Sequence, residues 1–81
     1  MEEKQERITL KALRERVGIT QRELARRTDN TVSAIGYWEA GKKLPSLPNA
    51  ISIAKELGIS LKQLSFSLGL DTTGVPDDEP N

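Results

Sequence analysis

The sequence has 81 residues, enough for one small domain and too few for a two-domain enzyme or a long array of repeats. Apolar residues make up 36% and charged residues 30%, and no apolar run approaches the roughly 20 residues that cross a bilayer. We therefore expect a soluble globular domain with no membrane partner. The chain has neither Cys nor His, which most zinc sites and most acid–base or nucleophilic reactions use. We accordingly expect no metal, no cofactor and no enzyme activity.

The net charge of zero conceals an uneven distribution of charge along the chain. Residues 1–6 carry a net charge of −2 and residues 71–81 carry −4, whereas residues 7–43 carry nine Lys and Arg against four acids. A basic middle between acidic ends is typical of a protein with a nucleic-acid-binding face. The charged amino end lacks the apolar stretch of a secretory signal, so we expect a cytoplasmic protein.

Apolar spacing and capping residues predict two helices in the first part of the chain. Apolar residues at intervals of three and four predict a helix from Leu10 to Val17, which Gly18 ends. A second helix begins after Thr20, whose side chain forms a capping box with Glu23, and ends before Asp29-Asn30.

A third helix follows after a short break, and two more complete the fold. Thr31 is a suitable N-cap for a helix over residues 32–40. Ser46 caps a fourth helix that stops before Gly58, and Ser60 begins a fifth, with a second capping box, that ends at Gly69. No segment alternates apolar and polar residues as a strand does, so the predicted fold is all-α with five short helices.

The domain organisation follows from these elements and from composition. We expect a charged N-terminal extension over residues 1–7, a helical domain over residues 8–69 and an acidic tail over residues 70–81. The tail is polar and interrupted by Pro and Gly, a composition typical of disorder.

The second and third predicted helices have the spacing of a helix-turn-helix. A more specific pattern runs from residue 10 to residue 64, and it consists of Leu13-Arg14, Gly18-Ile19-Thr20-Gln21, Glu23-Leu24-Ala25, Ile35, Trp38-Glu39, Gly41-Lys42, Pro45, Ile53-Ala54, Leu57-Gly58 and Ile59-Ser60. This pattern resembles the Cro and phage-repressor-like helix-turn-helix family, also called the xenobiotic-response-element family. The resemblance implies a five-helix, lambda-repressor-like domain of bacterial or phage origin that binds operator DNA, usually as a two-fold dimer.

The resemblance also assigns roles in DNA binding. Base contacts fall to Val32, Ser33, Gly36 and Tyr37. None of these is Arg, Asn or Gln, so we expect weaker discrimination between bases than a bidentate side chain provides. Gly36 departs from the family pattern, and it either permits a closer approach of the DNA or is merely tolerated. Phosphate contacts fall to Gln21, Asn30, Thr31, Lys42 and Lys43, with a solvated surface role as the alternative.

Three further sets of residues receive structural roles. Arg14 and Glu39 resemble a family pair that fixes the third helix, the alternative being two surface charges. The core that anchors the helix-turn-helix is expected to contain Leu24, Ala25, Ile35 and Trp38. A dimer interface is expected at Phe66, Leu68 and Leu70, which could instead close the small core.

Two functions remain open. The first is a sequence-specific transcriptional regulator, most simply a repressor that binds a near-palindromic operator as a dimer and occludes the promoter. The second is a protein-interaction module, antitoxin-like or a co-regulator, that keeps the fold and binds DNA weakly. The net charge of zero and the uncharged surface formed by Val32, Ser33, Gly36 and Tyr37 favour this second function. A positive belt would favour DNA, and its candidate members are Lys11, Arg22, Arg26, Arg27, Lys42 and Lys43.

Overall fold

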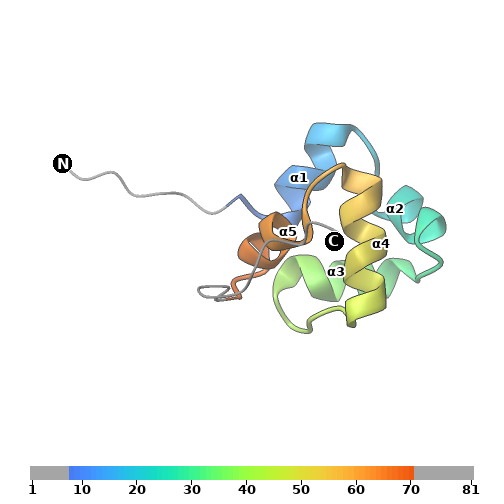
Figure 1. Cartoon of the computed structure of the whole chain (residues 1–81). Coiled ribbons are helices and arrows are strands. Elements are labelled where there is room, and N and C mark those ends of the chain that lie inside the picture. The colour runs from blue at the N-terminus through green and yellow to red at the C-terminus, as the bar shows by residue number, and fades with distance from the viewer. Residues whose placement is uncertain (1–7, 71–81) are drawn as a thin grey trace.

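A computed structural model describes residues 8–70 of the chain, and this part contains five helices and no strand. The helices are α1 (Leu10–Val17), α2 (Gln21–Arg27), α3 (Val32–Ala40), α4 (Leu47–Leu57) and α5 (Leu61–Ser67), arranged as Figure 1 shows. The predicted all-α class with five helices is confirmed. The extension over residues 1–7 and the tail beyond Leu70 lie outside the described residues.

Each helix begins at a hydroxyl residue whose side-chain oxygen accepts a hydrogen bond from the backbone N–H three positions on. The five N-cap residues are Thr9, Thr20, Thr31, Ser46 and Ser60. These bonds satisfy a donor that the first turn of each helix leaves unpaired. Only half of the capping box at α2 forms, because the Glu23 carboxylate accepts from Arg26 and Arg27 instead of reaching back to Thr20. Guanidinium donors one turn along the helix bind a carboxylate more strongly than a neutral backbone N–H does.

All five helices end in the same way, with two backbone N–H groups beyond the helix bonding to carbonyls of its last turn. The residue in the left-handed conformation is glycine after four of the helices and Asp29 after α2, with φ 59°. This arrangement is the Schellman motif, for which glycine is preferred because a Cβ is strained there. It also explains why α5 stops at Ser67, two residues before Gly69, which takes the left-handed position.

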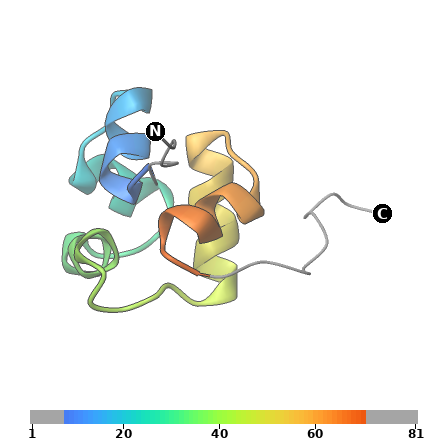
Figure 2. The ribbon, with the colours of Figure 1, turned by 90° about the vertical axis from the view of Figure 1, so that its left-hand side faces the viewer.

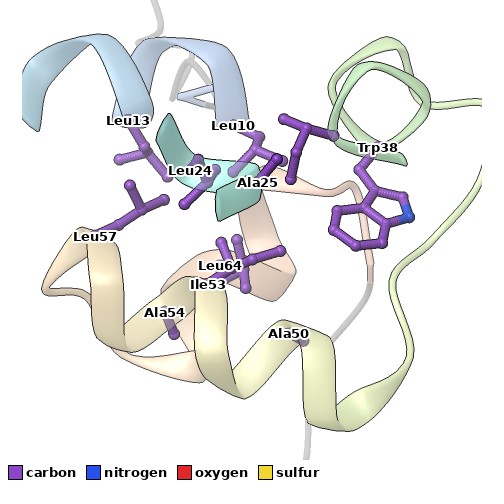
Figure 3. Packing of buried hydrophobic residues seen from close by; sticks show 11 residues of the cluster. Leu10, Leu13, Leu24, Ala25, Trp38, Ala50, Ile53, Ala54, Leu57 and Leu64 are labelled. Carbon is purple, nitrogen blue, oxygen red and sulfur yellow. The ribbon is translucent and has the colours of Figure 1, made fainter. Parts of the chain in front are cut away.

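The core collects apolar side chains from all five helices. Figure 3 shows the cluster of eleven buried residues, of which Leu10, Leu13, Leu24, Ile35, Ile53 and Leu64 are the largest fully buried ones. Burying a Leu or Ile side chain stabilises a fold by about 1.5–3 kcal/mol, so these residues hold the five short helices together. Among the core anchors expected from the sequence, Leu24 and Ile35 are fully buried, and Ala25 and Trp38 are 3% and 7% exposed.

The packing of α3 determines which of its sides is available to a ligand. Ile35 and Trp38 point into the core and are the buried residues of α3. The contacts of α3 are made chiefly with α2, as expected for a helix-turn-helix, and in Figure 2 α3 lies at the edge of the ribbon. One side of α3 is therefore held by the core while the other faces outwards. None of the helices in residues 8–70 has the length and apolar character needed to cross a membrane.

Candidate nucleic-acid interface

The outward side of α3 carries the four residues to which base contacts were assigned. Val32 and Tyr37 are 42% and 46% exposed, Ser33 is exposed and Gly36 is half-buried. Residues three or four apart on a helix are surface neighbours, so 32 and 36, 33 and 36, and 33 and 37 adjoin each other. We call this continuous surface of Val32, Ser33, Gly36 and Tyr37 the reading face. It contains no charged side chain, as the sequence indicated.

A lysine from the loop after α3 lies against the reading face. The Nζ atom of Lys43 is 5.3 Å from the centroid of the Tyr37 ring. A cation over an aromatic face at this distance contributes about 0.5–1 kcal/mol at an exposed site. The contact holds the Tyr37 ring and places a positive charge beside the otherwise neutral reading face. It links a residue expected to read bases with one expected to bind phosphate, a connection that the sequence did not predict.

Gly36 has no packing reason to be a glycine. A Cβ built at this position would have no heavy atom within 4 Å apart from its own helix backbone and chain neighbours, and its φ lies outside the left-handed region. Glycine within a helix costs about 1 kcal/mol relative to alanine. The described part of the chain therefore provides no compensation for this cost.

Three polar side chains join α1, α2 and α3 near the C-terminal end of α3. Arg14 donates from Nε to Oε2 of Glu39 at 2.5 Å and from Nη1 to the Ile19 carbonyl at 2.8 Å. The Gln21 amide donates to Oε1 of Glu39 at 2.9 Å. The side chains of Arg14 and Glu39 are only 8% and 6% exposed, and the hydrogen bond with Glu39 raises the pKa of Arg14. The structure thus brings Arg14 and Glu39 together as a buried pair.

The positions of Gln21 and Asn30 bear on their assignment as phosphate contacts. Gln21 has two amide hydrogens and gives one to Glu39, which leaves one for a phosphate. Asn30 is half-buried, and its amide nitrogen lies 3.0 Å from both the carbonyl and the hydroxyl oxygen of Thr28 and 3.3 Å from Oδ1 of Asn49. Both hydrogens of Asn30 are therefore engaged, and the residue ties the turn between α2 and α3 to α4. The sequence pattern did not predict this role, because Asn49 is distant along the chain.

The remaining residues that were expected to contact phosphate are exposed around α3. Thr31 caps the helix through its hydroxyl and leaves the helix N-terminus at the surface. Backbone N–H groups at such an end favour a negatively charged ligand. Lys42 and Lys43 are exposed in the loop that follows Gly41. These three residues flank the reading face at both ends of α3.

The positive belt expected from the sequence is smaller in the structure. Arg26 and Arg27 form ion pairs with Glu23, and Arg27 also lies 3.6 Å from a carboxylate oxygen of Glu56. The hydrogen bonds from Arg27 and then Arg26 lower the pKa of Glu23. Within residues 8–70, no carboxylate forms an ion pair with the other four members, which are Lys11, Arg22, Lys42 and Lys43. Residues 8–70 still carry ten Lys and Arg against five Asp and Glu, a net charge of +5.

An apolar surface lies beside the end of α5. Phe66 and Leu70 are 47% and 41% exposed, whereas Leu68 packs partly against the core. A groove adjoining this region is lined by Leu44, Pro45, Leu47, Ala50, Leu61, Ser65, Leu68 and Leu70. Leu44 and Leu47 are 54% and 62% exposed, and neither was expected from the sequence to belong to this surface. One signal in the sequence could have indicated this surface. Both leucines lie close to Pro45 and outside the apolar stripe of α4.

The fold and the exposed reading face are those of a DNA-binding domain, and comparison with known families identifies the family. A family model described as helix-turn-helix matches residues 10–64, about two-thirds of the chain. The chain therefore belongs to the helix-turn-helix family and is a DNA-binding regulator of the xenobiotic-response-element type. This family is one of regulatory domains and not of enzymes. Neither the curated proteins nor the solved structures gave a match.

Proposed function

We propose that this protein is a transcriptional repressor that binds a near-palindromic operator as a homodimer. The observation that carries the proposal is the arrangement of α3, with Ile35 and Trp38 buried and Val32, Ser33 and Tyr37 outside. A helix anchored in this way presents a rigid face of suitable width to the major groove, which admits an α-helix. The bound protein represses by covering promoter DNA.

The chemistry of the reading face limits how sharply it distinguishes bases. Val32 packs on a thymine methyl, the Ser33 hydroxyl bonds either a donor or an acceptor, and Tyr37 offers an aromatic ring with a hydroxyl tip. A bidentate Arg, Asn or Gln contact gives about 1–3 kcal/mol of discrimination, and none is present here. We therefore propose that the protein distinguishes base sequences moderately well. Phosphate contacts from Thr31, Lys42 and Lys43 set the register of the protein on the duplex.

The proposed dimer uses the apolar surface beside α5. Phe66 and Leu70 are exposed there, and Leu44 and Leu47 extend the surface along the adjoining groove. Exposed apolar surface on a small domain favours association. A two-fold dimer places two recognition helices about 34 Å apart, so the operator must contain two related half-sites one helical turn apart.

Selection from a random library of duplexes tests this function. The protein is incubated with the library at about 150 mM salt, where attraction to phosphate alone is already weakened, and the bound duplexes are amplified and sequenced. We expect an enriched inverted repeat. The absence of any enriched sequence, with only weak and salt-sensitive binding, would contradict the proposal and would favour the protein-interaction function.

A further inference from the structure

We infer that Gly36 is a specificity-determining residue, and that the space left by its missing Cβ accepts the methyl group of a thymine in the operator. This inference rests on the proposed function, since it concerns how the same reading face selects its bases. The space is the bare stretch of helix between the side chains of Val32, Ser33 and Tyr37, and we call it the glycine gap. It lies on the outward side of α3, opposite Ile35 and Trp38.

The first argument is that the gap is open and unexplained by the protein itself. A Cβ at Gly36 would touch nothing within 4 Å, so alanine fits the free protein without strain. Alanine is also the better helix former. A glycine that lowers stability and relieves no internal contact is accounted for when a ligand must approach the backbone closely, one of the recognised uses of glycine.

The second argument concerns the chemistry of the surroundings. Val32 is an exposed apolar side chain one turn before Gly36, and Tyr37, the next residue in the chain, carries an exposed aromatic ring over which Lys43 lies. The backbone N–H of a residue in the middle of a helix is already bonded along the helix, so the gap offers no donor to a phosphate oxygen. An apolar group suits this environment better than a charged one.

The third argument is one of size. Removing a Cβ frees the volume of one methyl group, and thymine differs from the other bases of the major groove in carrying an apolar methyl at C5. Val32 and the bare backbone of residue 36 therefore form two sides of a site for that methyl. Alanine at position 36 would fill the space that the thymine methyl needs.

The test combines a protein variant with a change of one methyl in the DNA. The duplex is the one that the natural chain selects from a random library, and each thymine of its half-sites is replaced in turn by uracil, which lacks only the methyl. Dissociation constants are measured for the natural chain and for Gly36→Ala on every duplex. Because both methyls compete for the same space, the two changes must be non-additive at one thymine of each half-site.

At that thymine, we expect uracil to weaken binding of the natural chain about fourfold, the effect of one buried methyl group. Gly36→Ala should bind the thymine duplex at least about tenfold more weakly than the natural chain does. The same variant should bind the uracil duplex at least as tightly as it binds the thymine duplex. The same variant should melt about 4–8 °C higher, so that loss of binding does not reflect unfolding.

A composition-matched variant separates the stability effect from recognition. Ala12 is exposed on α1, and exchanging the two residues in Ala12→Gly/Gly36→Ala moves the glycine out of α3 without changing composition. We expect the melting temperature of this double variant to be close to that of the natural chain. Like Gly36→Ala, it should bind the uracil duplex no more weakly than the thymine duplex. Ala12→Gly alone should melt lower and bind every duplex as the natural chain does.

Two results would overturn the inference alone. The first is equal affinity of the natural chain and Gly36→Ala for every duplex. The second is a loss of affinity in Gly36→Ala that is the same with thymine and uracil at all positions, because the methyl is then not the group in contact. If the natural chain selects no sequence, the proposed function fails, and this inference fails with it.

Discussion

Arg14 of α1 and Glu39 of α3 form a buried ion pair, with Nε of the guanidinium 2.5 Å from Oε2 of the carboxylate. A second hydrogen bond runs from Nη2 to Oε1 at 3.3 Å, so the pair is bidentate. Gln21 joins the same carboxylate from the start of α2. The carboxylate therefore fixes the end of the recognition helix to both preceding helices.

Glu39→Gln should lower thermal stability and DNA affinity together. The amide removes the charge opposite the buried Arg14 guanidinium, and loss of hydrogen bonding to a charged group costs about 1.5–3 kcal/mol. DNA affinity falls because the angle of α3 is no longer fixed. Thermal melting and equilibrium binding to the selected duplex measure the two effects, with Glu15→Gln on the exposed side of α1 as the charge-matched control. Unchanged melting and binding in Glu39→Gln would refute the role of the pair.

Asp29→Gly should stabilise the protein. Asp29 is the left-handed residue after α2, with φ 59°, where the other four helices have glycine. The substitution relieves strain and removes an acidic group from a helix C-terminus, which we expect to raise stability by about 0.5–1 kcal/mol. The melting temperature should rise by about 2–8 °C.

Asp29→Asn separates the two causes. It removes the charge and keeps a side chain that tolerates the left-handed region, so we expect a smaller increase in melting temperature. A decrease in the melting temperature of Asp29→Gly would show that the aspartate stabilises the turn.

Lys42→Ala and Lys43→Ala should have different effects on DNA binding. Each removes one expected phosphate contact, so each should reduce the slope of log affinity against log salt by about 0.9. Lys43 also lies over the Tyr37 ring, so Lys43→Ala should in addition change the relative affinity for duplexes that differ at the base read by Tyr37. Binding titrations at several salt concentrations measure both quantities. Identical base preference in the two variants would contradict the role of the Lys43–Tyr37 contact.

Phe66→Glu should yield a folded monomer. Phe66 is 47% exposed, so a charged residue there leaves the core intact while opposing an apolar interface. Sedimentation equilibrium gives the mass, and circular dichroism reports the helix content. Ile51→Glu is the matched control, because Ile51 is similarly exposed at 41% and lines a second groove that shares only Leu61 with the groove of the proposed interface. An unaltered mass for Phe66→Glu would refute the proposed interface.

The bounds of the helices could be predicted from the sequence because they depend on local interactions. The hydroxyl N-caps and the glycines that follow the helices lie next to the elements that they end. The start of α1 at Leu10 was predicted from apolar spacing alone, and the capping role of Thr9 was not predicted. The partners of Asn30 and Glu23 could not be predicted, because they depend on which helices pack together and on competition between donors.

The reading face could be assigned from the sequence by position but not in its details. The resemblance indicated positions 32, 33, 36 and 37, and the core positions of Ile35 and Trp38 require that these residues face outwards. The open space at Gly36 and the placement of Lys43 over Tyr37 depend on side-chain positions that spacing does not give. The same applies to the groove along Leu44 and Leu47, which combines residues from two helices and a loop.

The ratio of affinities for the selected duplex and for a scrambled duplex of the same composition, at about 150 mM salt, tests the central claim most directly. If the reading face recognises sequence, the natural chain should prefer the selected duplex by about 10³, at the lower end of the usual range because no bidentate contact is present. A folded Ser33→Ala/Tyr37→Ala variant should lose most of this preference and keep its affinity for the scrambled duplex. A ratio near one for the natural chain would contradict sequence-specific DNA binding by this protein.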